Sequence, residues 1–280
     1  MTLPLIIVPV FNALDKLEAC LNSIAQTVPG DAQILLIDDA STDEGVQPLL
    51  QAWVNQAKSQ RRLLTHKENL GFVATANHGM RLAATDVVLL NSDTEVTEGW
   101  LQRLMDCLQS DPSIATATPW SNNGEIVSIP AFCVANPPPD DADAVANVIA
   151  SCGTASYPEM PTAVGFCMAI SLHAIRLIGV FDEESFGRGY GEENDFCQRA
   201  EQAGLRNVLC DNAYVVHHGG ASFGPLGLKP DESTMQRLLK KHPDYHRKVS
   251  EFIKNDPLAA RREEILTCLQ LADPSFRVPD

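Results

Sequence analysis

Short apolar runs alternate with amphipathic segments through about the first 120 residues, and this alternation predicts the fold. The apolar runs are rich in Val, Ile and Leu on both faces, which is typical of strands buried in a parallel sheet. They occupy residues 3–10, 32–39, 62–66, 86–93 and 113–119. The segments between them have the spacing of helices with one apolar face and cover Leu14–Ile24, 44–58, Val73–Leu82 and 98–109. The sequence therefore predicts an α/β, Rossmann-like protein with a mostly parallel central sheet flanked by helices.

Polar residues follow four of the predicted strands, at the point where each strand ends. The segments are "PVFN" (9–12), "DDAS" (38–41), "HKENLGF" (66–72) and "NSDTE" (91–95). Each could cap a helix, and for Ser41 and Thr42 that role explains the sequence as well as ligand binding does. Asp38 and Asp39, however, repel each other unless a ligand or hydrogen bonds neutralise them. Because ligands bind beyond the carboxyl ends of parallel strands, we expect one shared site at this edge of the sheet.

The second half of the chain contains a prominent acidic cluster. After an irregular stretch from 119 to 161, we expect an apolar strand and a short helix within 162–179, where Gly165 favours a close backbone approach or a bulge. A glycine-rich loop then leads into a helix that opens with Glu192, Glu193 and Asp195. Acidic residues at a helix start can simply stabilise the helix dipole. Three of them beside such a loop favour a general base among them.

The strand expected at Ala213–Val216 ends in His217 and His218. A histidine at a strand end is usually packed or solvated. Here His217 would return to the same edge of the sheet, where a ring nitrogen could complete a metal site. The remaining C-terminal segment is charged and helical in pattern, and it carries no evident chemistry.

The balance of 21 basic and 36 acidic residues narrows the classes of partner. A formal net charge of −15 disfavours nonspecific binding to nucleic acid or anionic lipid. No apolar stretch is long enough to span a membrane, and "MTLPLIIVPVFN" lacks the features of a signal peptide. Eight cysteines without regular spacing indicate reduced, mostly buried thiols. We expect a cytoplasmic protein with no integral membrane segment, whose partners would account for any contact with the inner face of the membrane.

Nucleotide binding is compatible with this edge of the sheet, although two common phosphate-binding motifs are absent. GxGxxG does not follow the first strand, and GxxxxGK[ST] does not occur. Asp38, Asp39 and the backbone at 9–11 could hold a base and ribose, while a divalent cation on Asp93 holds the diphosphate. Oxygen ligands of this kind suit Mn2+ or Mg2+.

Six segments in this order resemble family 2 glycosyltransferases of the GT-A fold over about the first 225 residues. They are "VPVFNALDKLEACLNSI", "LLIDDASTD", "NLGFVATANHGMRLA", "VVLLNSDTEV", "GEENDF" and "HHGGASF". Asn91 replaces the first Asp of the family's DXD segment, as in the rhamnosyl- and galactofuranosyltransferase-like branch. The resemblance implies a glycosyltransferase domain at 1–225, with a nucleotide-binding half at 1–119 and an acceptor-binding half at 120–225, followed by a helical tail at 226–280.

The resemblance also implies roles for individual residues. Asp38 and Asp39 would bind the nucleobase or ribose, in a pocket lined by Pro9, Phe11 and Asn12. The diphosphate and the sugar would lie against Asn69, Gly71, Asn77, Asn91 and Ser92. The metal ion, Mn2+ or Mg2+, would bind Asp93 and His217. The acceptor pocket would include Gly165, Gly191 and Asp195.

The implied reaction transfers a hexosyl or deoxyhexosyl group, with inversion, from a UDP- or dTDP-sugar to a hydroxyl of a glycan or lipid-linked saccharide, as in polysaccharide biosynthesis. Glu193 stands where the family usually has Asp, so Glu193, or Glu192 beside it, would deprotonate the acceptor. Two other classes compete. A nucleotidyltransferase that makes NDP-sugars would need a glycine-rich loop after the first strand, which "PVFNALDKLEAC" lacks. A noncatalytic sugar- or partner-binding module would have lost the base.

Overall fold

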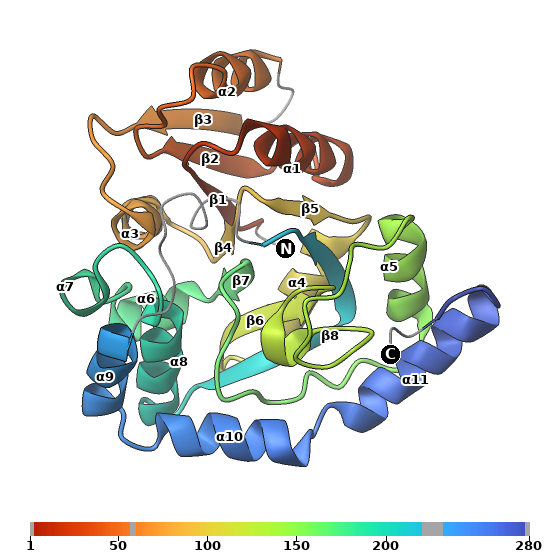
Figure 1. Ribbon diagram of the computed structural model, residues 1–280. Helices are drawn as coiled ribbons and strands as arrows, with labels where there is room; N and C mark the ends of the chain where they lie inside the picture. Colours follow the sequence, from red (N-terminus) through yellow and green to blue (C-terminus); the bar gives the residue numbers. More distant parts are fainter. Residues whose placement is uncertain (1–2, 57–59, 220–231, 278–280) are drawn as a thin grey trace.

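The computed structural model describes residues 3–56, 60–219 and 232–277, and a single sheet runs through its centre (Figure 1). The strands are β1 (Leu5–Val10), β2 (Gln33–Asp38), β3 (Gln60–Thr65), β4 (Val87–Leu90), β5 (Thr94–Val96), β6 (Ile114–Trp120), β7 (Cys167–Ile170) and β8 (Arg206–His217). Their order in the sheet is β3-β2-β1-β4-β7-β6-β8-β5. β5 and β7 run antiparallel to their neighbours, and the other pairings are parallel. The predicted α/β class with a mostly parallel sheet is confirmed.

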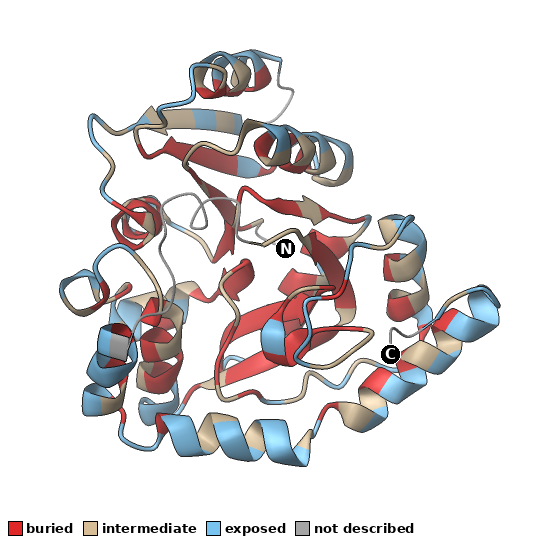
Figure 2. Ribbon diagram, in the orientation of Figure 1, coloured by how far each residue is buried: buried red, intermediate tan, exposed pale blue. Residues whose placement is uncertain are grey.

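Helices cover both faces of the sheet, which explains why the central strands are apolar throughout (Figure 2). Ile6 and Val8 point into one core and Ile7 into the other, because successive side chains alternate across a strand. The first core is completed by α1 (Leu14–Thr27), α2 (Val46–Asn55), α4 (Trp100–Gln109), η1 (Glu125–Val127), α5 (Ala142–Ser151) and α11 (Ala259–Ala272). The second is completed by α3 (Phe72–Leu82), α6 (Leu172–Ile178), α7 (Glu183–Phe186), α8 (Glu192–Gln202), α9 (Glu232–Lys241) and α10 (Tyr245–Asn255).

The strand predicted at 86–93 is shorter in the structure, and a separate short strand follows it. β4 ends at Leu90, and the chain turns through 91–93 before β5 pairs antiparallel with β8. The Thr94 hydroxyl donates to the Asn91 carbonyl at 2.7 Å and closes this turn locally. In the β5–β8 pairing Thr94 lies opposite His217. The polar tip of the predicted strand therefore lies against the end of β8.

The C-terminal helices pack on the rest of the protein and extend both cores. Leu238 of α9 and Tyr245 of α10 belong to the second core, and Ile265 and Leu269 of α11 belong to the first. The predicted helical character of this region is confirmed, while its boundary between 225 and 226 lies outside the described residues. Within the described ranges, no helix is both long and apolar enough to cross a membrane.

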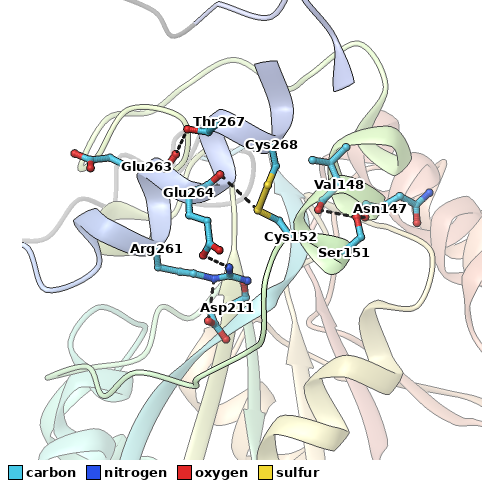
Figure 3. Close-up of a disulfide and its surroundings, with 10 residues drawn as sticks. All are labelled: Asn147, Val148, Ser151, Cys152, Asp211, Arg261, Glu263, Glu264, Thr267 and Cys268. Carbon is cyan, nitrogen blue, oxygen red and sulfur yellow. Dashed lines mark hydrogen bonds and ion pairs between the residues drawn. A yellow bond between two sulfur atoms is a disulfide. The ribbon is translucent and has the colours of Figure 1, made fainter. Parts of the chain in front are cut away.

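The expectation that the cysteines are all reduced is wrong. Cys152, directly after α5, forms a disulfide with Cys268 of α11 (Figure 3). Spacing gave no sign of this pair because 116 residues separate its members. Only the packing of α11 against α5 brings them together. Nearby, Arg261 Nε lies 3.1 Å from a carboxylate oxygen of buried Asp211, which adds an ion pair between α11 and β8.

Candidate active site

The turn between β4 and β5 brings Asp93 next to His217 at the end of β8. The His218 amide donates to the Asp93 carbonyl at 3.0 Å, which holds the turn against the strand end. Asp93 is buried, and its Oδ1 lies 3.6 Å from His217 Nε2. The two residues expected to bind a metal are thus adjacent in the structure.

The His217 ring is held so that one nitrogen faces the Asp93 carboxylate. Its Nδ1 lies 2.7 Å from the Asn123 carbonyl, which can only accept, so Nδ1 carries a proton and donates it. Phe166 stacks on the ring, with centroids 5.1 Å apart. Burial lowers the pKa of His217, but the hydrogen bond and charge of Asp93 outweigh it and raise the pKa above its ordinary value. Metal-binding histidines usually have the other ring nitrogen bonded to a carbonyl or carboxylate in this way.

This donor pair fits a divalent cation that takes its other ligands from a substrate. In the parts of the chain that the structure describes, no group of three or more His, Cys, Asp or Glu side chains could hold a metal. Mg2+ is commonly bound by one or two carboxylates together with substrate phosphates. Asn91 and Ser92 lie in the same turn, Asn91 half-buried and Ser92 buried. A cation here would be shared with a diphosphate.

A row of three ionisable side chains, Glu95, His218 and Lys16, lies beside Asp93 and His217. His218 Nε2 lies 2.5 Å from Glu95 Oε1, and His218 Nδ1 lies 3.3 Å from Lys16 Nζ. Lys16 comes from the first turn of α1, so three separate elements meet here. They bring an ammonium group to this edge of a protein whose net charge is −15. A local cation of this kind favours phosphate binding.

Asp38 and Asp39, at the end of β2, are both buried and are held by hydrogen bonds within the protein. Asp39 accepts from the backbone amides of Leu70 at 2.9 Å and Gly71 at 2.8 Å. His66 Nδ1 lies 2.8 Å from Asp39 Oδ1. Internal donors therefore neutralise much of the repulsion between the two carboxylates, and Asp39 ties the end of β2 to the loop before α3.

The loops after β1 and β2 are joined through Asn12. Its amide donates to the Ser41 hydroxyl at 2.9 Å, and its side-chain oxygen accepts from the Thr42 amide at 2.8 Å. The Ser41 amide in turn donates to Asp38 Oδ1 at 3.0 Å. The structure thus brings the residues expected around the nucleobase to one edge. Of the remaining two, Pro9 lies near the end of β1 and Phe11 directly follows that strand.

The glycine-rich loop before α8 packs on the loop before α3. The Phe72 amide donates to the Arg188 carbonyl at 3.2 Å, and the Arg188 guanidinium donates to the Asn69 carbonyl at 3.3 Å. Gly71 has φ +89°, and a Cβ there would lie 2.8 Å from Arg188 Cα, so only glycine fits. Asn69 and Gly71 therefore meet the segment that leads to the acidic cluster.

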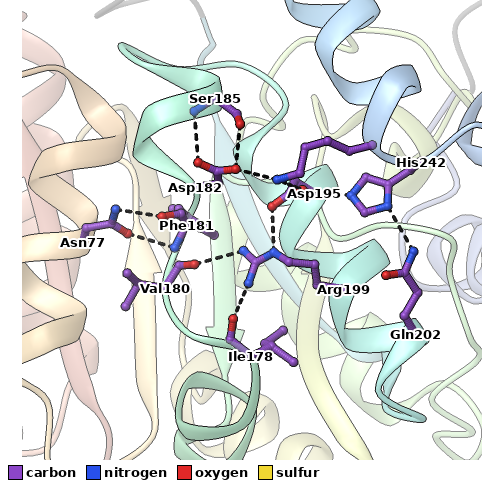
Figure 4. A network of polar contacts seen from close by, with 11 residues as sticks. Asn77, Ile178, Val180, Phe181, Asp182, Ser185, Asp195, Arg199, Gln202 and His242 are labelled. Atoms are coloured by element: carbon purple, nitrogen blue, oxygen red, sulfur yellow. Dashed lines mark hydrogen bonds and ion pairs between the residues drawn. The ribbon is translucent and has the colours of Figure 1, made fainter.

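Asn77 has a structural position that corrects its predicted role at the diphosphate and sugar. It is buried within α3, where Nδ2 donates to the Phe181 carbonyl at 3.0 Å (Figure 4). Its Oδ1 accepts from the Phe181 amide at 2.9 Å. The side-chain amide is thus used in joining α3 to the segment before α7.

Glu192 and Glu193 form the first turn of α8, which follows Gly191 at φ +94°. Burial, and then the charge of Glu193, raise the pKa of Glu192 well above its ordinary value. Burial and, to a smaller extent, the charge of Glu125 raise the pKa of Glu193 to about 7. In the described structure, Oε2 of each carboxylate is buried without a hydrogen-bond partner. A buried carboxylate with a pKa near neutrality is suited to accept a proton from a substrate.

Glu125 of η1 connects this acidic pair with the histidine at the end of β8. Its charge contributes to the raised pKa of both Glu193 and His217. Contacts of the segment 162–166 link the same two regions. The Thr162 hydroxyl donates to Asn194 Oδ1, next to Glu193, at 2.7 Å, and Phe166 stacks on the His217 ring. This segment therefore contacts both the first turn of α8 and the end of β8.

Asp195 lies in α8 but does not line this site, which corrects the prediction that it belongs to the acceptor pocket. It is fully buried and bonds to Arg199, Lys241 and His242 (Figure 4). Burial opposes ionisation of Asp195, yet hydrogen bonds from these three partners outweigh it and hold the pKa below its ordinary value. Asp195 is an internal anion with a full set of protein donors.

The two glycines expected at the acceptor pocket differ in their surroundings. A Cβ on Gly165 would meet no described atom within 4 Å, so this position borders open space. A Cβ on Gly191 would lie 3.0 Å from the Phe186 ring and 3.3 Å from Thr234 Cγ2. Gly191 therefore lets α8 begin against packed side chains, and Gly165 agrees better with an acceptor pocket.

Several residues of the site were not found from the sequence. His66 Nε2 lies 3.0 Å from His78 Nδ1, and the rings stack, which extends the bonds around Asp39 toward α3. The sequence predicts only an irregular stretch at "WSNNG", although its run of polar residues was a signal of a site. The other residues missed are Lys16, Glu95, Asn123, Glu125 and Asn122, whose side-chain oxygen accepts from the His217 amide at 2.9 Å.

Residues 5–132 match the protein family described as "Glycosyl transferase family 2". Over 95 residues the chain is 34% identical to a "PGL/p-HBAD biosynthesis glycosyltransferase" of Mycobacterium bovis, covering 33% of this chain and 36% of that protein. Over 85 residues it is 29% identical to "N-acetylgalactosaminyltransferase 7" of Drosophila melanogaster, covering 30% of this chain and 14% of that protein. The chain therefore spans about a third or less of the length of these curated relatives.

Solved glycosyltransferase structures share the whole fold. "Mannosyltransferase PcManGT from Pyrobaculum calidifontis in complex with GDP-Man and Mn2+" gives a TM-score of 0.59 at 16% identity, over 100% of this chain and 78% of that one. "Crystal structure of GalNAc-T7 with UDP, GalNAc and Mn2+" gives 0.61 at 15%, over 96% and 57%. "Crystal structure of S. aureus TarS 1-349 in complex with UDP-GlcNAc" gives 0.58 at 14%, over 97% and 80%. The fold is GT-A, and residues 5–132 match glycosyl transferase family 2.

Proposed function

We propose that this protein is an inverting glycosyltransferase that uses a nucleotide-diphosphate sugar as donor. The observation that carries the proposal is the approach of Asp93 to His217 at 3.6 Å, with the segment 162–166 joining that pair to the start of α8 through Phe166, which stacks on His217, and Thr162, which donates to Asn194. A proton acceptor, Glu193, and a phosphate-binding pair, Asp93 with His217, would then lie in one site. The match of residues 5–132 to family 2 supports the same reaction class.

The donor would bind along the ends of β1 and β2 and the turn after β4. The base and ribose would lie where Asn12 and Asp38 join the two loops. Asp39 preorganises Gly71 for contact with the diphosphate and sugar, because it fixes that backbone before the donor arrives. Lys16 adds positive charge nearby. We propose UDP or dTDP as the nucleotide, and two similar structures, those of GalNAc-T7 and S. aureus TarS, are complexes with UDP and UDP-GlcNAc.

A divalent cation, Mn2+ or Mg2+, would be held by Asp93 and His217 and would supply charge neutralisation for the departing diphosphate. The Asn123 carbonyl keeps the proton on Nδ1 of His217, so that Nε2 faces Asp93. Asn91 offers an amide where a second carboxylate is usual. This substitution supports the rhamnosyl- or galactofuranosyltransferase-like branch, and hence transfer of a hexosyl or deoxyhexosyl group.

Glu193 would remove the proton of the acceptor hydroxyl as that oxygen attacks the anomeric carbon from the face opposite the diphosphate. One displacement of this geometry inverts the configuration of the sugar. With a pKa of about 7, Glu193 is ionised in a large fraction of molecules at neutral pH and remains basic enough to take a proton. The charge of Glu193 adds to the effect of burial and raises the pKa of Glu192 well above its ordinary value. We propose a glycan or lipid-linked saccharide as acceptor, approaching past Gly165.

The proposal is tested by incubating the purified protein with a panel of UDP-, dTDP- and GDP-sugars in the presence of Mn2+. Release of the nucleoside diphosphate, increased by an acceptor saccharide, is the expected result. Formation of an NDP-sugar from a nucleoside triphosphate and a sugar phosphate would instead identify a nucleotidyltransferase. Tight sugar binding with no turnover of any donor would identify a binding module and refute the enzymatic proposal.

A further inference from the structure

The proposed base, Glu193, lies on α8, and residues of the C-terminal region bond to the same helix through Asp195. Asp195 is on α8, in the same first turn as Glu193, and its side chain is 0% exposed. Its carboxylate lies 2.7 Å from Arg199 Nε, 2.7 Å from Lys241 Nζ and 2.8 Å from His242 Nε2. Figure 4 shows Arg199 and His242 on either side of Asp195. A buried carboxylate with this many donors is stable only while its partners stay in place.

The three partners of Asp195 come from two parts of the chain, and each part makes a different connection. Arg199 belongs to α8 itself and also donates to the carbonyls of Ile178 at 2.5 Å and Val180 at 2.9 Å. It therefore fixes α8 to the segment after α6. Lys241 and His242 lie at the end of α9, so they alone among these partners connect α8 to the C-terminal helices.

Further contacts lock the α9 end in place. Lys241 Nζ also lies 2.5 Å from Asp182 Oδ2, and the Gln202 amide lies 3.2 Å from His242 Nδ1. His242 Nε2 lies against the Asp195 carboxylate and Nδ1 against the Gln202 amide, so both ring nitrogens have a hydrogen-bond partner. At the other end of α9, Thr234 packs against Gly191, directly before Glu192. α9 thus contacts α8 beside both the start of the helix and its buried anion.

We propose that His242 and Lys241 are positioning residues for catalysis, which hold Glu193 at the angle needed to reach the acceptor. The inference rests on the proposed function and assigns a role to a tail in which the sequence offered no chemistry. Loss of the α9 contact would leave Asp195 short of donors in a buried place, and α8 would shift to relieve it. Small misplacements of a catalytic group cost roughly 100-fold in rate.

The test compares His242→Ala with His242→Gln, in which the amide nitrogen takes the place of Nε2. His242→Ala should lower kcat by about 10-fold or more, in line with the cost of misplacing a catalytic group, and leave the KM for the donor nearly unchanged. His242→Gln should recover most of the loss. Lys241→Met should resemble His242→Ala, and it provides a second route if that variant is unstable.

Lys248→Ala is the matched control. Lys248 on α10 also joins the C-terminal region to α8, at 2.7 Å from Glu201 and 3.1 Å from Gln198, but near the far end of the helix. Its removal should leave kcat unchanged. An active parent whose His242→Ala variant folds and keeps the parental kcat would overturn the inference alone. An equal loss in the Lys248→Ala control would also overturn it, and a parent without transferase activity would refute the proposed function instead.

Discussion

Glu192 and Glu193 are neighbours in the first turn of α8, and in the described structure each buries a carboxylate oxygen that has no hydrogen-bond partner. Stabilisation of a helix dipole does not require this burial, since solvent-exposed acids in the first turn already provide it. Because Oε2 of Glu193 accepts no hydrogen bond from a described residue, it could accept one from a substrate hydroxyl.

Glu193→Gln should therefore lower turnover by roughly 100- to 10,000-fold while donor binding stays nearly unchanged, because only the proton acceptor is lost. Glu192→Gln should lower turnover less. Steady-state kinetics and UDP titration calorimetry on both variants measure the two effects. A folded Glu193→Gln enzyme with the parental rate would reject the assignment and make Glu192 the next candidate.

The raised pKa of Glu193 predicts the pH dependence of the reaction. The carboxylate must be ionised to act as base, so kcat at saturating metal and donor should rise with pH and level off above about 7. The pKa of His217 is also raised above its ordinary value, so the ionisation of His217 contributes to the same pH profile. Metal-dependent UDP binding followed by calorimetry at each pH separates the two, because it depends on His217 and not on Glu193.

The same pKa makes a prediction about stability. Glu193 has a higher pKa in the folded protein, about 7, than its ordinary value of 4.5, so the fold binds its proton more tightly. The contribution of this proton is present below pH 4.5 and is lost as the pH rises through 7. Glu193→Gln should accordingly raise Tm relative to the parent at pH 8 and not at pH 4.5. A thermal melt series shows whether the difference grows with pH.

Asp93 and His217 should act together on metal-dependent binding. UDP or dTDP should bind more tightly with Mn2+ or Mg2+ than with EDTA, and purine nucleotides should bind worse. Asp93→Asn and His217→Ala should each reduce the gain from the metal by roughly 10- to 100-fold, as for other residues that hold or orient a metal. Equal UDP affinity in Mn2+ and in EDTA for the parent would contradict a metal bridge.

Asn77→Ala should destabilise the protein and leave the KM for the donor almost unchanged. The substitution strands the buried amide and carbonyl of Phe181, at a cost of about 1–3 kcal/mol for each unsatisfied group. Chemical denaturation measures the loss in the free energy of unfolding. A rise in donor KM without loss of stability would restore the predicted role of Asn77 beside the sugar.

The disulfide between Cys152 and Cys268 should contribute to stability, because it closes a long loop in the unfolded chain. Cys268→Ser should lower the free energy of unfolding by about 2–4 kcal/mol. Intact mass before and after reduction and alkylation verifies the bond. Since the linked helices α5 and α11 are not part of the candidate active site, kcat should stay at the parental value in the folded variant.

The pattern of the sequence alone determined the class of fold and one edge of the site. Strands buried on both faces must be apolar throughout, so the alternation with amphipathic helices was sufficient to predict the α/β sheet. Asp38, Asp39 and Asp93 were expected at one edge because parallel strands end together. The return of His217 to Asp93 followed from the same rule, and the structure brings them to 3.6 Å.

Tertiary structure decided which polar residues face a substrate and which face the protein. Asp195 and Glu193 look equivalent in the sequence, yet Asp195 meets His242, 47 residues away, while Glu193 keeps an oxygen without a described partner. The same holds for Cys152 and its distant partner Cys268. Burial and periodicity can be predicted from the local sequence, because they depend on residues within one or two turns of the same element. The partner of a buried charge or thiol depends on how distant helices pack, and no spacing along the chain records that.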